Sequence, residues 1–374
     1  MDRVFDVVVI GAGMAGASIA AFLSEHRRVA LVEAEEAAGY HTTGRSAALW
    51  TANYGPPDVR LLTRLSRAFF AAPPEGFAST PLMRHRPVLF LATEAQLPEL
   101  NHVVADSAGL VRPITVAEAK TMLPALRDDY ASGAAVEDDS FDMDVSAIHQ
   151  GFLRQLRIRD GVLALRSRAG RIVRASETWH VETSSGAVFQ AGTVVNAAGA
   201  WGDEVAALAG AAPLGLVPKR RTAAIVDPSP WDAEHWPMVL DVGENWYARP
   251  EARTRLMVSP ADETASCPHD VRPEEIDVAI GIDRMQQALA ITVRRVEHSW
   301  AGLRTFTPDG SLAFGWDSGQ DGFFWCVGQG GYGIQTSPAA GRLAANLVLR
   351  RDPGEAAPAV AMIDHARFRA AARR

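Results

Sequence analysis

The sequence predicts an α/β (α+β) fold with two domains, one built on a parallel sheet and a second, antiparallel-sheet domain inserted into it. Three observations support this prediction. A strand, a glycine-rich turn, a helix and a second strand fill the first 33 residues. A buried strand followed by a helix returns at residues 323–350, near the other end of the chain. Residues 213–300, between these two, are rich in Pro and Trp and in strand-like runs.

The first elements follow from local sequence. Residues 4–10 form a short β-branched run typical of a buried strand. Glycines at 11–16 interrupt it, and residues 17–26 have the pattern of a helix with apolar side chains on one side. A second strand, Val29 to Val32, ends at Glu33. A strand, helix and strand in roughly 30 residues form the minimal right-handed parallel crossover.

Later elements are predicted from short apolar runs. We expect strands at 87–91, 178–181, 192–196 and 323–327, and helices beginning near Ser146 and Ser337. The acidic run from Val136 to Asp144 is interpreted as a solvated loop, and His149 as a structural residue. The first domain is assigned to residues 1–80, 142–212 and 300–374, and the inserted domain to residues 81–141 and 213–299.

Composition excludes several classes of protein. Of 374 residues, 48% are hydrophobic and 22% charged, as in ordinary globular proteins. Lys and Arg (37) are outnumbered by Asp and Glu (44) and are scattered, so nucleic acid is not an expected partner. The two cysteines, Cys267 and Cys326, cannot build a disulfide framework or a structural zinc site, and we expect no metal. We expect no transmembrane segment and a cytoplasmic location; a peripheral contact with the inner membrane stays open.

The glycines at 11–16 match a dinucleotide-binding fingerprint of the Rossmann type. Gly11 permits the tight turn, Gly13 lets a pyrophosphate approach the backbone, and Gly16 lets helix and strand pack closely. The N-terminus of the following helix would attract the phosphates. Glu33, 22 positions after Gly11, would accept hydrogen bonds from a ribose diol.

The segment after Glu33 distinguishes FAD from NAD. Residues 39–50 are polar and glycine-bearing, and we predict no third strand there. Such a stretch suits a cofactor that extends beyond its pyrophosphate. The sequence therefore favours FAD.

Five motifs carry a family resemblance. They are HTTGRSAA at 41–48, VNAAGAW at 195–201, PKRR at 218–221, HSWAGLRTF at 298–306 and GQGGYGIQT at 328–336. In this set and order they resemble the D-amino-acid oxidase/dehydrogenase superfamily of FAD enzymes, and most of all its bacterial FAD-dependent D-arginine dehydrogenase type. The resemblance covers nearly the whole chain. It implies a Rossmann-like FAD-binding domain with an inserted antiparallel-sheet substrate domain.

The resemblance also implies which residues contact the flavin cofactor. Beyond the three glycines, the implied contacts are Ala15, Glu33, Ala34, Thr42, Thr43, Gly44, Arg45, Ser46, Ala47, Ala48, Leu49, Ala169, Gly330, Gly331, Tyr332, Gly333, Ile334 and Gln335. Backbone N–H groups of the last loop would stabilise negative charge on the reduced flavin. We expect non-covalent FAD, because Arg304 stands where covalently linked sarcosine oxidases have a Cys. His41 is the alternative point of attachment.

The substrate site is likewise implied by the resemblance. Arg304, assisted by Arg221, would bind the amino-acid carboxylate, since a guanidinium binds a carboxylate bidentately. Tyr54 and Tyr247 would contact that carboxylate or close the pocket. The remaining implied or neighbouring pocket residues are Thr51, Gly331, Gln335, Met238, Leu240 and Trp246.

Two positions depart from the D-arginine type. Its carboxylate and imidazole positions fall on Val88 and Leu49. A buried cation facing these apolar side chains would lose its hydration without compensation. The expected substrates are therefore D-amino acids with apolar side chains.

The expected reaction is oxidative deamination by hydride transfer from Cα to flavin N5, giving an imine that hydrolyses to a 2-keto acid and ammonia. The alternatives are a secondary-amine oxidase of the sarcosine, glycine or proline type and a non-catalytic FAD-binding sensor. The resemblance implies that oxidases of the sarcosine branch place a Lys near the flavin, but this chain has only Lys120 and Lys219. The segment from Arg255 to Val258 has apolar residues at the relevant positions. We expect a dehydrogenase that passes electrons to a quinone or dye rather than to O2.

Overall fold

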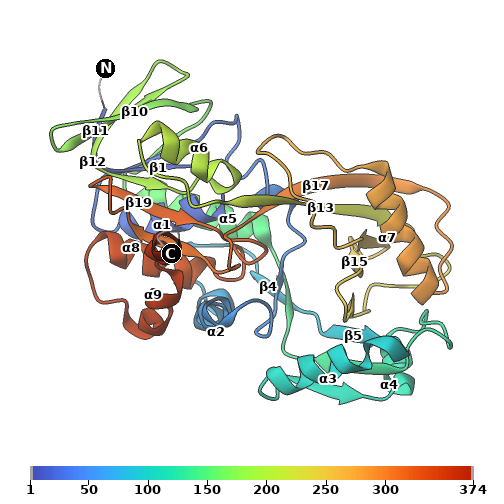
Figure 1. Cartoon of the computed structure of the whole chain (residues 1–374). Helices are drawn as coiled ribbons and strands as arrows, with labels where there is room; N and C mark the ends of the chain where they lie inside the picture. The colour runs from blue at the N-terminus through green and yellow to red at the C-terminus, as the bar shows by residue number, and fades with distance from the viewer. Residues whose placement is uncertain (1–2, 372–374) are drawn as a thin grey trace.

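A computed structural model describes residues 3–371, and its first sheet has a parallel centre. The strands there run in the order β19-β12-β1-β2-β9 (Figure 1). Their bounds are Phe323–Val327, Val188–Asn196, Arg3–Ile10, Val29–Val32 and Val162–Ala164. The two ends of the chain therefore meet in one sheet, as predicted. Antiparallel strands β10 (Ala169–Ala175), β11 (Thr178–Thr183) and β18 (Ala313–Trp316) extend it.

Helices cover one face of this sheet. A shared core joins α1 (Met14–Leu23), α2 (Pro57–Ala71), α5 (Val145–Ile158), α8 (Ser337–Val348) and α9 (Ala357–Ile363). Stacked and edge-to-face rings of Phe22, Phe69 and Phe152 pack within it. Helix α6 (Gly202–Leu208) packs with a second core on the opposite face. The chain is described to the end of α10 (Ala366–Ala371).

The second sheet belongs to the other half of the molecule (Figure 1). Its strand order is β17-β13-β16-β15-β14-β5-β7-β6, and all neighbours are antiparallel except β14 and β5. In that order the strands span Val296–Phe306, Val217–Val226, Arg255–Ser259, Tyr247–Glu251, Met238–Asp241, Val88–Ala92, Gly133–Glu137 and Val111–Ile114. The inserted, largely antiparallel sheet is confirmed.

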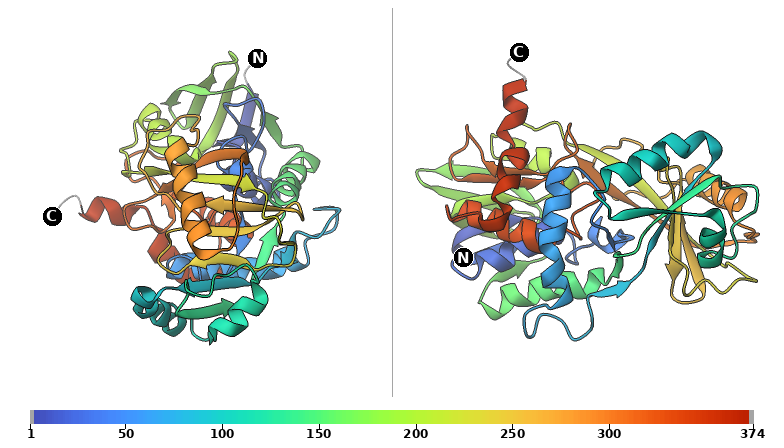
Figure 2. Two further views of the ribbon diagram at one scale, coloured as in Figure 1. Left: turned by 90° about the vertical axis from the view of Figure 1, so that its right-hand side faces the viewer. Right: turned by 90° about the horizontal axis from the view of Figure 1, so that it is seen from below.

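Helices and a small sheet complete the second half. Figure 2 shows α7 (Glu275–Ala288) on one side of the sheet, with α3 (Leu97–Asp106) and α4 (Val116–Met122) near β5. A separate three-stranded sheet is formed, in this order, by β3 (Leu49–Trp50), β8 (Phe141–Met143) and β4 (Met83–His85). Short 3-10 turns occupy Thr43–Arg45, Glu94–Gln96, Gly199–Trp201 and Gly354–Ala356.

The segment after Glu33 differs from the prediction in one detail. We predicted no strand within residues 39–50, but Leu49 and Trp50 form β3, which pairs with β8 and not with the parallel sheet. The proposed boundary at residue 300 falls inside β17, and the boundary at 142 falls inside β8. Within residues 3–371, no helix is both long and apolar enough to cross a membrane.

Candidate functional site

A long cleft joins the two halves of the molecule. It encloses about 1630 Å³, counting its open mouth, and extends from the β1–α1 turn to β13 and β17. Its lining spans both the predicted dinucleotide-binding turn and predicted substrate-binding residues. Of the predicted site residues, those that line it are Gly11, Gly13, Ala15, Glu33, Ala34, Thr42, Thr43, Arg45, Ser46, Ala47, Ala169, Arg221, Tyr247, Arg304, Gly330, Gly331, Gly333 and Ile334.

The glycine turn at one end of the cleft is required by close backbone contacts. Gly11 has φ +100°, and a Cβ there would lie 2.5 Å from the carbonyl oxygen of Ala197. A Cβ on Gly16 would lie 1.8 Å from the carbonyl oxygen of Gly11. Gly16 therefore packs α1 against the turn and does not line the cleft. Gly13 precedes α1 without a side-chain cap, so first-turn N–H groups of the helix remain available to an anion.

Glu33 is held rigidly beside this turn. Its Oε2 accepts a hydrogen bond from the N–H of Ala12 at 2.8 Å, and its Oε1 accepts one from the N–H of Glu35 at 3.0 Å. Buried His149 supports the turn from behind, with Nε2 2.9 Å from the carbonyl oxygen of Ala12. Each carboxylate oxygen of Glu33 has a lone pair left for a ribose hydroxyl. The glycine turn and this carboxylate fit the adenosine and pyrophosphate of FAD.

The segment at 39–48 is tied to both halves of the cleft. Thr43 Oγ1 accepts from the N–H of Met14 at 2.9 Å, and Thr42 Oγ1 donates to the carbonyl of Leu303 at 2.6 Å. Arg45 lines the cleft, but its guanidinium donates to backbone carbonyls and pairs with Asp270. The nearby Arg45 guanidinium lowers the pKa of the Asp270 carboxyl despite its partial burial. Gly44, Ala48 and Leu49 lie outside the lining.

His41, the alternative attachment point, makes polar contacts within the protein. Its Nε2 lies 3.0 Å from Glu35 Oε1, and its ring lies 4.6 Å from that of Trp201. Cys326 is fully buried in β19, and burial raises the pKa of its thiol to about 12. A neutral, buried thiol is a poor nucleophile.

Arg304 lies at the other end of the cleft. The side chain rises from β17, and its Nη1 donates to the Tyr54 hydroxyl at 3.4 Å. A Cβ on Gly331 would lie 3.2 Å from both Arg304 Nη1 and the Tyr54 oxygen, so these groups converge over the glycine loop. In the part of the chain that the structure describes, no Asp or Glu forms an ion pair with Arg304. The guanidinium is partly buried and lacks a carboxylate partner, and the geometry suits a carboxylate supplied by a ligand.

The electrostatics around Arg304 keep it charged. Burial alone would lower the pKa of Arg304, but its interactions with Tyr54, Tyr247 and Glu263 outweigh burial and raise the pKa. The pKa of the Tyr247 hydroxyl is shifted in the opposite direction. Burial would raise the pKa of its hydroxyl, yet Arg304 and Arg221 together lower it. The site therefore presents positive charge and phenolic donors to an anion.

Arg221 reaches the same end of the cleft but is already paired. Its Nη2 lies 3.0 Å from Glu263 Oε1, and its Nε donates to the carbonyl of Asp262 at 2.9 Å. The guanidinium also lies 6.0 Å from the ring centroid of Tyr247. Of the two predicted carboxylate ligands, Arg304 is thus the one with free capacity.

Predicted pocket residues form an apolar wall behind the cleft. Val88, Met238, Leu240 and Leu49 belong to one apolar cluster of the second sheet. Val88 stands opposite Met238 in register, and Leu240 stands opposite Tyr247. None of the four belongs to the lining of the cleft itself.

Trp246 does not belong to this wall, contrary to the prediction. Side chains alternate across a strand, so the neighbour of Tyr247 points to the opposite face. Trp246 is only 1% exposed, packs in the core beneath α7, and donates from Nε1 to the Tyr130 hydroxyl at 3.1 Å.

Thr51 and Gln335 turn into the protein instead of toward the cleft. Gln335 Nε2 donates to Thr63 Oγ1 at 2.9 Å. Thr51 Oγ1 donates to Glu137 Oε2 at 2.7 Å, and the N–H of Ala52 donates to the other oxygen at 2.9 Å. Tyr332 is mostly buried, with its ring 5.1 Å from that of Tyr54.

The acidic run at 136–144 was also placed wrongly, since it contains the end of β7 and the whole of β8. Glu137 is the buried carboxylate of this run. It was assigned to a solvated acidic loop, but it is 1% exposed at the end of β7, in register with Val88. Burial raises the pKa of its carboxyl, against the opposing hydrogen bonds from Thr51 and Ala52. Its neighbours along the sequence give no signal for this, because the burial comes from β5 and the 51–53 segment.

Several lining residues were not predicted. At the nucleotide end they are Ser167, Arg168, Ala198, Gly199, Ala200, Trp201, Glu204 and Leu208, and near the substrate end they are Gly302, Leu303, Thr305 and Gln329. The motifs at 195–201, 298–306 and 328–336 contain most of these positions. The family resemblance therefore marked the segments without assigning these contacts.

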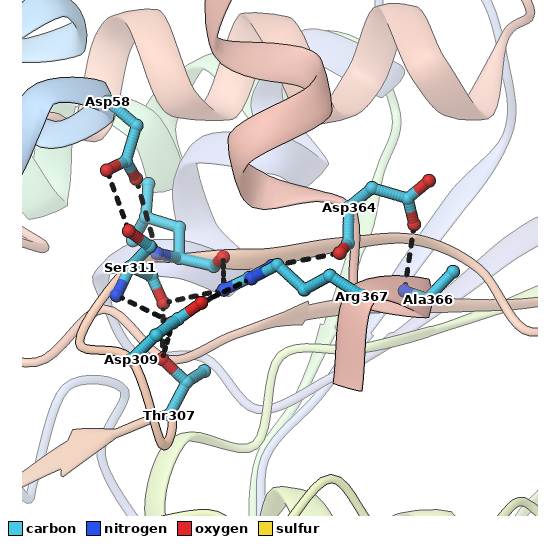
Figure 3. Close-up of polar contacts among 8 residues, drawn as sticks. Asp58, Thr307, Asp309, Ser311, Asp364, Ala366 and Arg367 are labelled. Atoms are coloured by element: carbon cyan, nitrogen blue, oxygen red, sulfur yellow. Dashed lines mark hydrogen bonds and ion pairs between the residues drawn. The ribbon is translucent and has the colours of Figure 1, made fainter. Parts of the chain in front are cut away.

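A polar network fixes the chain beyond β17. Figure 3 shows Asp309 accepting from Thr307 and Arg367, while Ser311 donates to buried Asp58 of α2 at 2.8 Å. The Thr307 methyl would lie 2.7 Å from a Cβ placed on Gly328, whose φ is +80°. The network thus joins α2, α10 and the end of β17, and it restrains the glycine loop at 328–331 beside Arg304.

Comparison with known proteins agrees with this geometry. The family described as "DAO: FAD dependent oxidoreductase" matches residues 6–347. Glycine oxidase of Geobacillus kaustophilus (strain HTA426) is 26% identical over 94% of this chain and 95% of its own length, and a solved structure of that enzyme superposes with a TM-score of 0.82. FAD-dependent oxidoreductase domain-containing protein 1 of Xenopus laevis is 28% identical over 52% of this chain but only 42% of its own length. L-proline dehydrogenase from P. horikoshii shares the fold at 20% identity, with a TM-score of 0.86 over 99% of both chains.

Proposed function

The chain belongs to the DAO family of FAD-dependent oxidoreductases, and on that basis we propose that it oxidises the Cα–N bond of amino acids, preferring D-amino acids with apolar side chains. The observation that carries the proposal is Arg304, a partly buried guanidinium without an ion-pair partner among residues 3–371, beside Tyr54 and the glycine loop. A free carboxylate is the chemical group that complements it.

The residues of the site would orient the substrate. FAD, when bound, supplies the acceptor of the two electrons and hydrogen lost from Cα. Arg304 would hold the carboxylate, with Tyr247 beside it in the cleft lining and Tyr54 hydrogen-bonded to Arg304, so that Cα is fixed relative to the 330–334 loop. Loss of a hydride from Cα of the neutral amine would leave the protonated imine, and water would convert this to a 2-keto acid and ammonium. A neutral substrate amine needs no side-chain base for this step.

The apolar surroundings of Tyr247, which lines the cleft, support the preference in side chain, since Met238 and Leu240 pack against it. Val88 is 2% exposed, and Leu49, Met238 and Leu240 pack with it. The buried carboxylate beside Val88, Glu137, already accepts hydrogen bonds from Thr51 and Ala52. A cationic side chain would find little compensation for its desolvation here.

A second candidate is oxidation of glycine or a secondary amine. It is favoured by the 26% identity to glycine oxidase over nearly the whole chain. Both candidates use the same carboxylate site and differ in the substituents on nitrogen and Cα. The enzyme would then accept glycine, sarcosine or proline more efficiently than any D-amino acid with a large side chain.

The surroundings of the two lysines support a dehydrogenase. Lys120 lies on α4 and pairs with Asp128, away from the cleft lining. Lys219 Nζ pairs with Glu263 at 2.8 Å and lies 5.0 Å from the ring centroid of Phe306. Met257 and Val258 of β16 are buried apolar residues. These residues therefore provide no fixed, unneutralised cation that would stabilise superoxide.

Two measurements test the proposal. Steady-state kcat/KM with a dye acceptor, measured for D- and L-amino acids, glycine, sarcosine and proline, ranks the candidates; D-Leu, D-Met or D-Phe should rank first. Stopped-flow mixing of the reduced enzyme with air-saturated buffer should show reoxidation far slower than turnover with the dye. Highest efficiency with sarcosine or proline would favour the second candidate, and reoxidation as fast as turnover would make the enzyme an oxidase.

A further inference from the structure

Strand β13 divides its cationic side chains between two faces. Lys219 stands opposite Arg304 of β17 in register, and Arg221 stands opposite Gly302, so Lys219 and Arg221 share the face of Arg304. Arg220, between them, points to the other face and pairs with Glu274 and Asp277 at the start of α7. Three cations therefore gather on this face; Arg221 and Arg304 line the cleft, and Lys219 lies beside them outside its lining.

One carboxylate bridges two of these three cations. Glu263 Oε1 lies 3.0 Å from Arg221 Nη2, and its Oε2 lies 2.8 Å from Lys219 Nζ. Arg304 contributes only through longer-range electrostatics, since it forms no ion pair with Glu263. The Glu263 carboxylate thus takes the position that an anionic ligand of Arg221 and Lys219 would take.

Backbone hydrogen bonds hold the segment that carries Glu263. The N–H of Arg220 donates to the carbonyl of Thr264 at 2.8 Å, and the N–H of Ser266 donates to the carbonyl of Pro218 at 2.9 Å. Asp262, one residue earlier, accepts from both the N–H and the hydroxyl of Thr222 at 2.6 and 2.9 Å. The segment therefore runs along β13 as a built part of the site, and Glu263 is fixed from both sides.

We propose that Glu263 is a specificity-determining residue that occupies a second anion subsite, made by Arg221 and Lys219, and thereby restricts the enzyme to substrates with a single carboxylate. The inference rests on the proposed function, in which Arg304 binds the α-carboxylate. With Glu263 in place, Arg221 and Lys219 are neutralised, and a second carboxylate on the substrate would meet Glu263 as a like charge. Without the charge of Glu263, the two cations would accept that carboxylate.

The ionisation of Glu263 agrees with this role. Partial burial would raise the pKa of its carboxyl, but Lys219, Arg221 and Arg304 outweigh burial and lower it. Glu263 is therefore anionic at neutral pH. Its side chain is 42% exposed, so a Gln at this position can be accommodated without burying an unpaired amide.

The test compares Glu263→Gln with Glu274→Gln in the FAD-loaded enzyme. Both changes remove one carboxylate that pairs with a β13 cation, but Glu274 pairs with Arg220 on the opposite face. Binding of acetate and of malonate, two non-reducible ligands, is measured by flavin absorbance and by calorimetry. Glu263→Gln should tighten malonate at least tenfold and change acetate by less than threefold, while Glu274→Gln should change neither.

A substrate pair gives a second readout. The ratio of kcat/KM for D-aspartate to that for D-alanine should rise at least tenfold in Glu263→Gln, and adding Arg221→Gln should remove the gain in malonate binding. Equal changes for acetate and malonate, or no change, would show that Glu263 only fastens its segment and would overturn the proposal. If no amine reduces the wild-type flavin, the proposed function fails, yet the malonate-to-acetate comparison still decides the role of Glu263.

Discussion

The Arg304→Met variant tests whether Arg304 binds the substrate or stabilises the fold. Methionine keeps much of the length and apolar stem of the side chain but removes the guanidinium. Because Arg304 has no ion-pair partner among residues 3–371, the fold loses only the long hydrogen bond to Tyr54 at 3.4 Å. The substrate, in contrast, loses its bidentate partner. The variant should therefore lose activity without losing stability.

The expected magnitudes follow from the burial of the site. Removing one partner of a desolvated, hydrogen-bonded charge pair costs roughly 3–5 kcal/mol, or about 150- to 5,000-fold in kcat/KM. Removing a partly buried charge that lacks an ion-pair partner should leave Tm equal to or above that of the wild type. FAD content should not change, because the Arg304 guanidinium reaches the substrate end of the cleft.

Arg86→Met is the matched contrast. Arg86 is more deeply buried than Arg304, with its side chain 7% exposed, and it pairs with Asp142 at 2.8 Å and donates to the carbonyls of Glu234 and Trp236. Its loss should lower the free energy of unfolding by about 3–5 kcal/mol. Dye-coupled kinetics and thermal melts of both variants make the comparison. Near-normal kcat/KM in Arg304→Met, or a fall in its Tm as large as that of Arg86→Met, would refute the reasoning.

Three further predictions concern buried groups, and a fourth concerns the attachment of the flavin. Val88→Glu should raise the kcat/KM of D-Arg relative to D-Leu and lower Tm, because the new carboxylate stands opposite Glu137; an unchanged ratio would remove Val88 from the pocket. Burial raises the pKa of the Glu137 carboxyl above its ordinary value of 4.5. Between these two pKa values the folded protein keeps a proton that the unfolded chain has lost. The free energy of unfolding should therefore fall as pH rises from about 4.5 through the raised pKa. Glu137→Gln should flatten that part of the Tm–pH curve, and a curve parallel to the wild type would contradict this. In a thiol titration of the native enzyme, exposed Cys267 should react and buried Cys326 should not. Acid precipitation of the protein should release all of the flavin, and flavin retained in the pellet would show covalent attachment.

The sequence was most informative where structure is local. The N-terminal strand, turn and helix were predicted from an apolar run and from glycines whose close contacts leave no room for a side chain. Arg304 and Tyr54 were predicted through a family resemblance, because nothing in their local sequence shows that they converge. Residues 195–201 and 298–306 were recognised as motifs, yet the cleft contacts within them depend on how the sheets meet.

The sequence was least informative where two distant segments decide the environment. Glu137 lies in an acidic run, and only the pairing of β7 with β5 buries it beside Val88. Trp246 was placed in the pocket because it neighbours Tyr247, although alternation along a strand sends it to the other face. The pairing of Arg221 with Glu263 joins residues 42 positions apart, and no periodicity reports it.

Anaerobic titration of the FAD-loaded enzyme with the two enantiomers of methionine tests the central claim most directly. The account predicts that D-methionine bleaches the flavin absorbance with one equivalent per flavin and yields equal amounts of 2-keto acid and ammonia, whereas L-methionine leaves the spectrum oxidised. The same titration of Arg304→Met should require far higher concentrations of D-methionine. Bleaching by L-methionine in preference to the D-enantiomer, or no bleaching by either, would contradict the account.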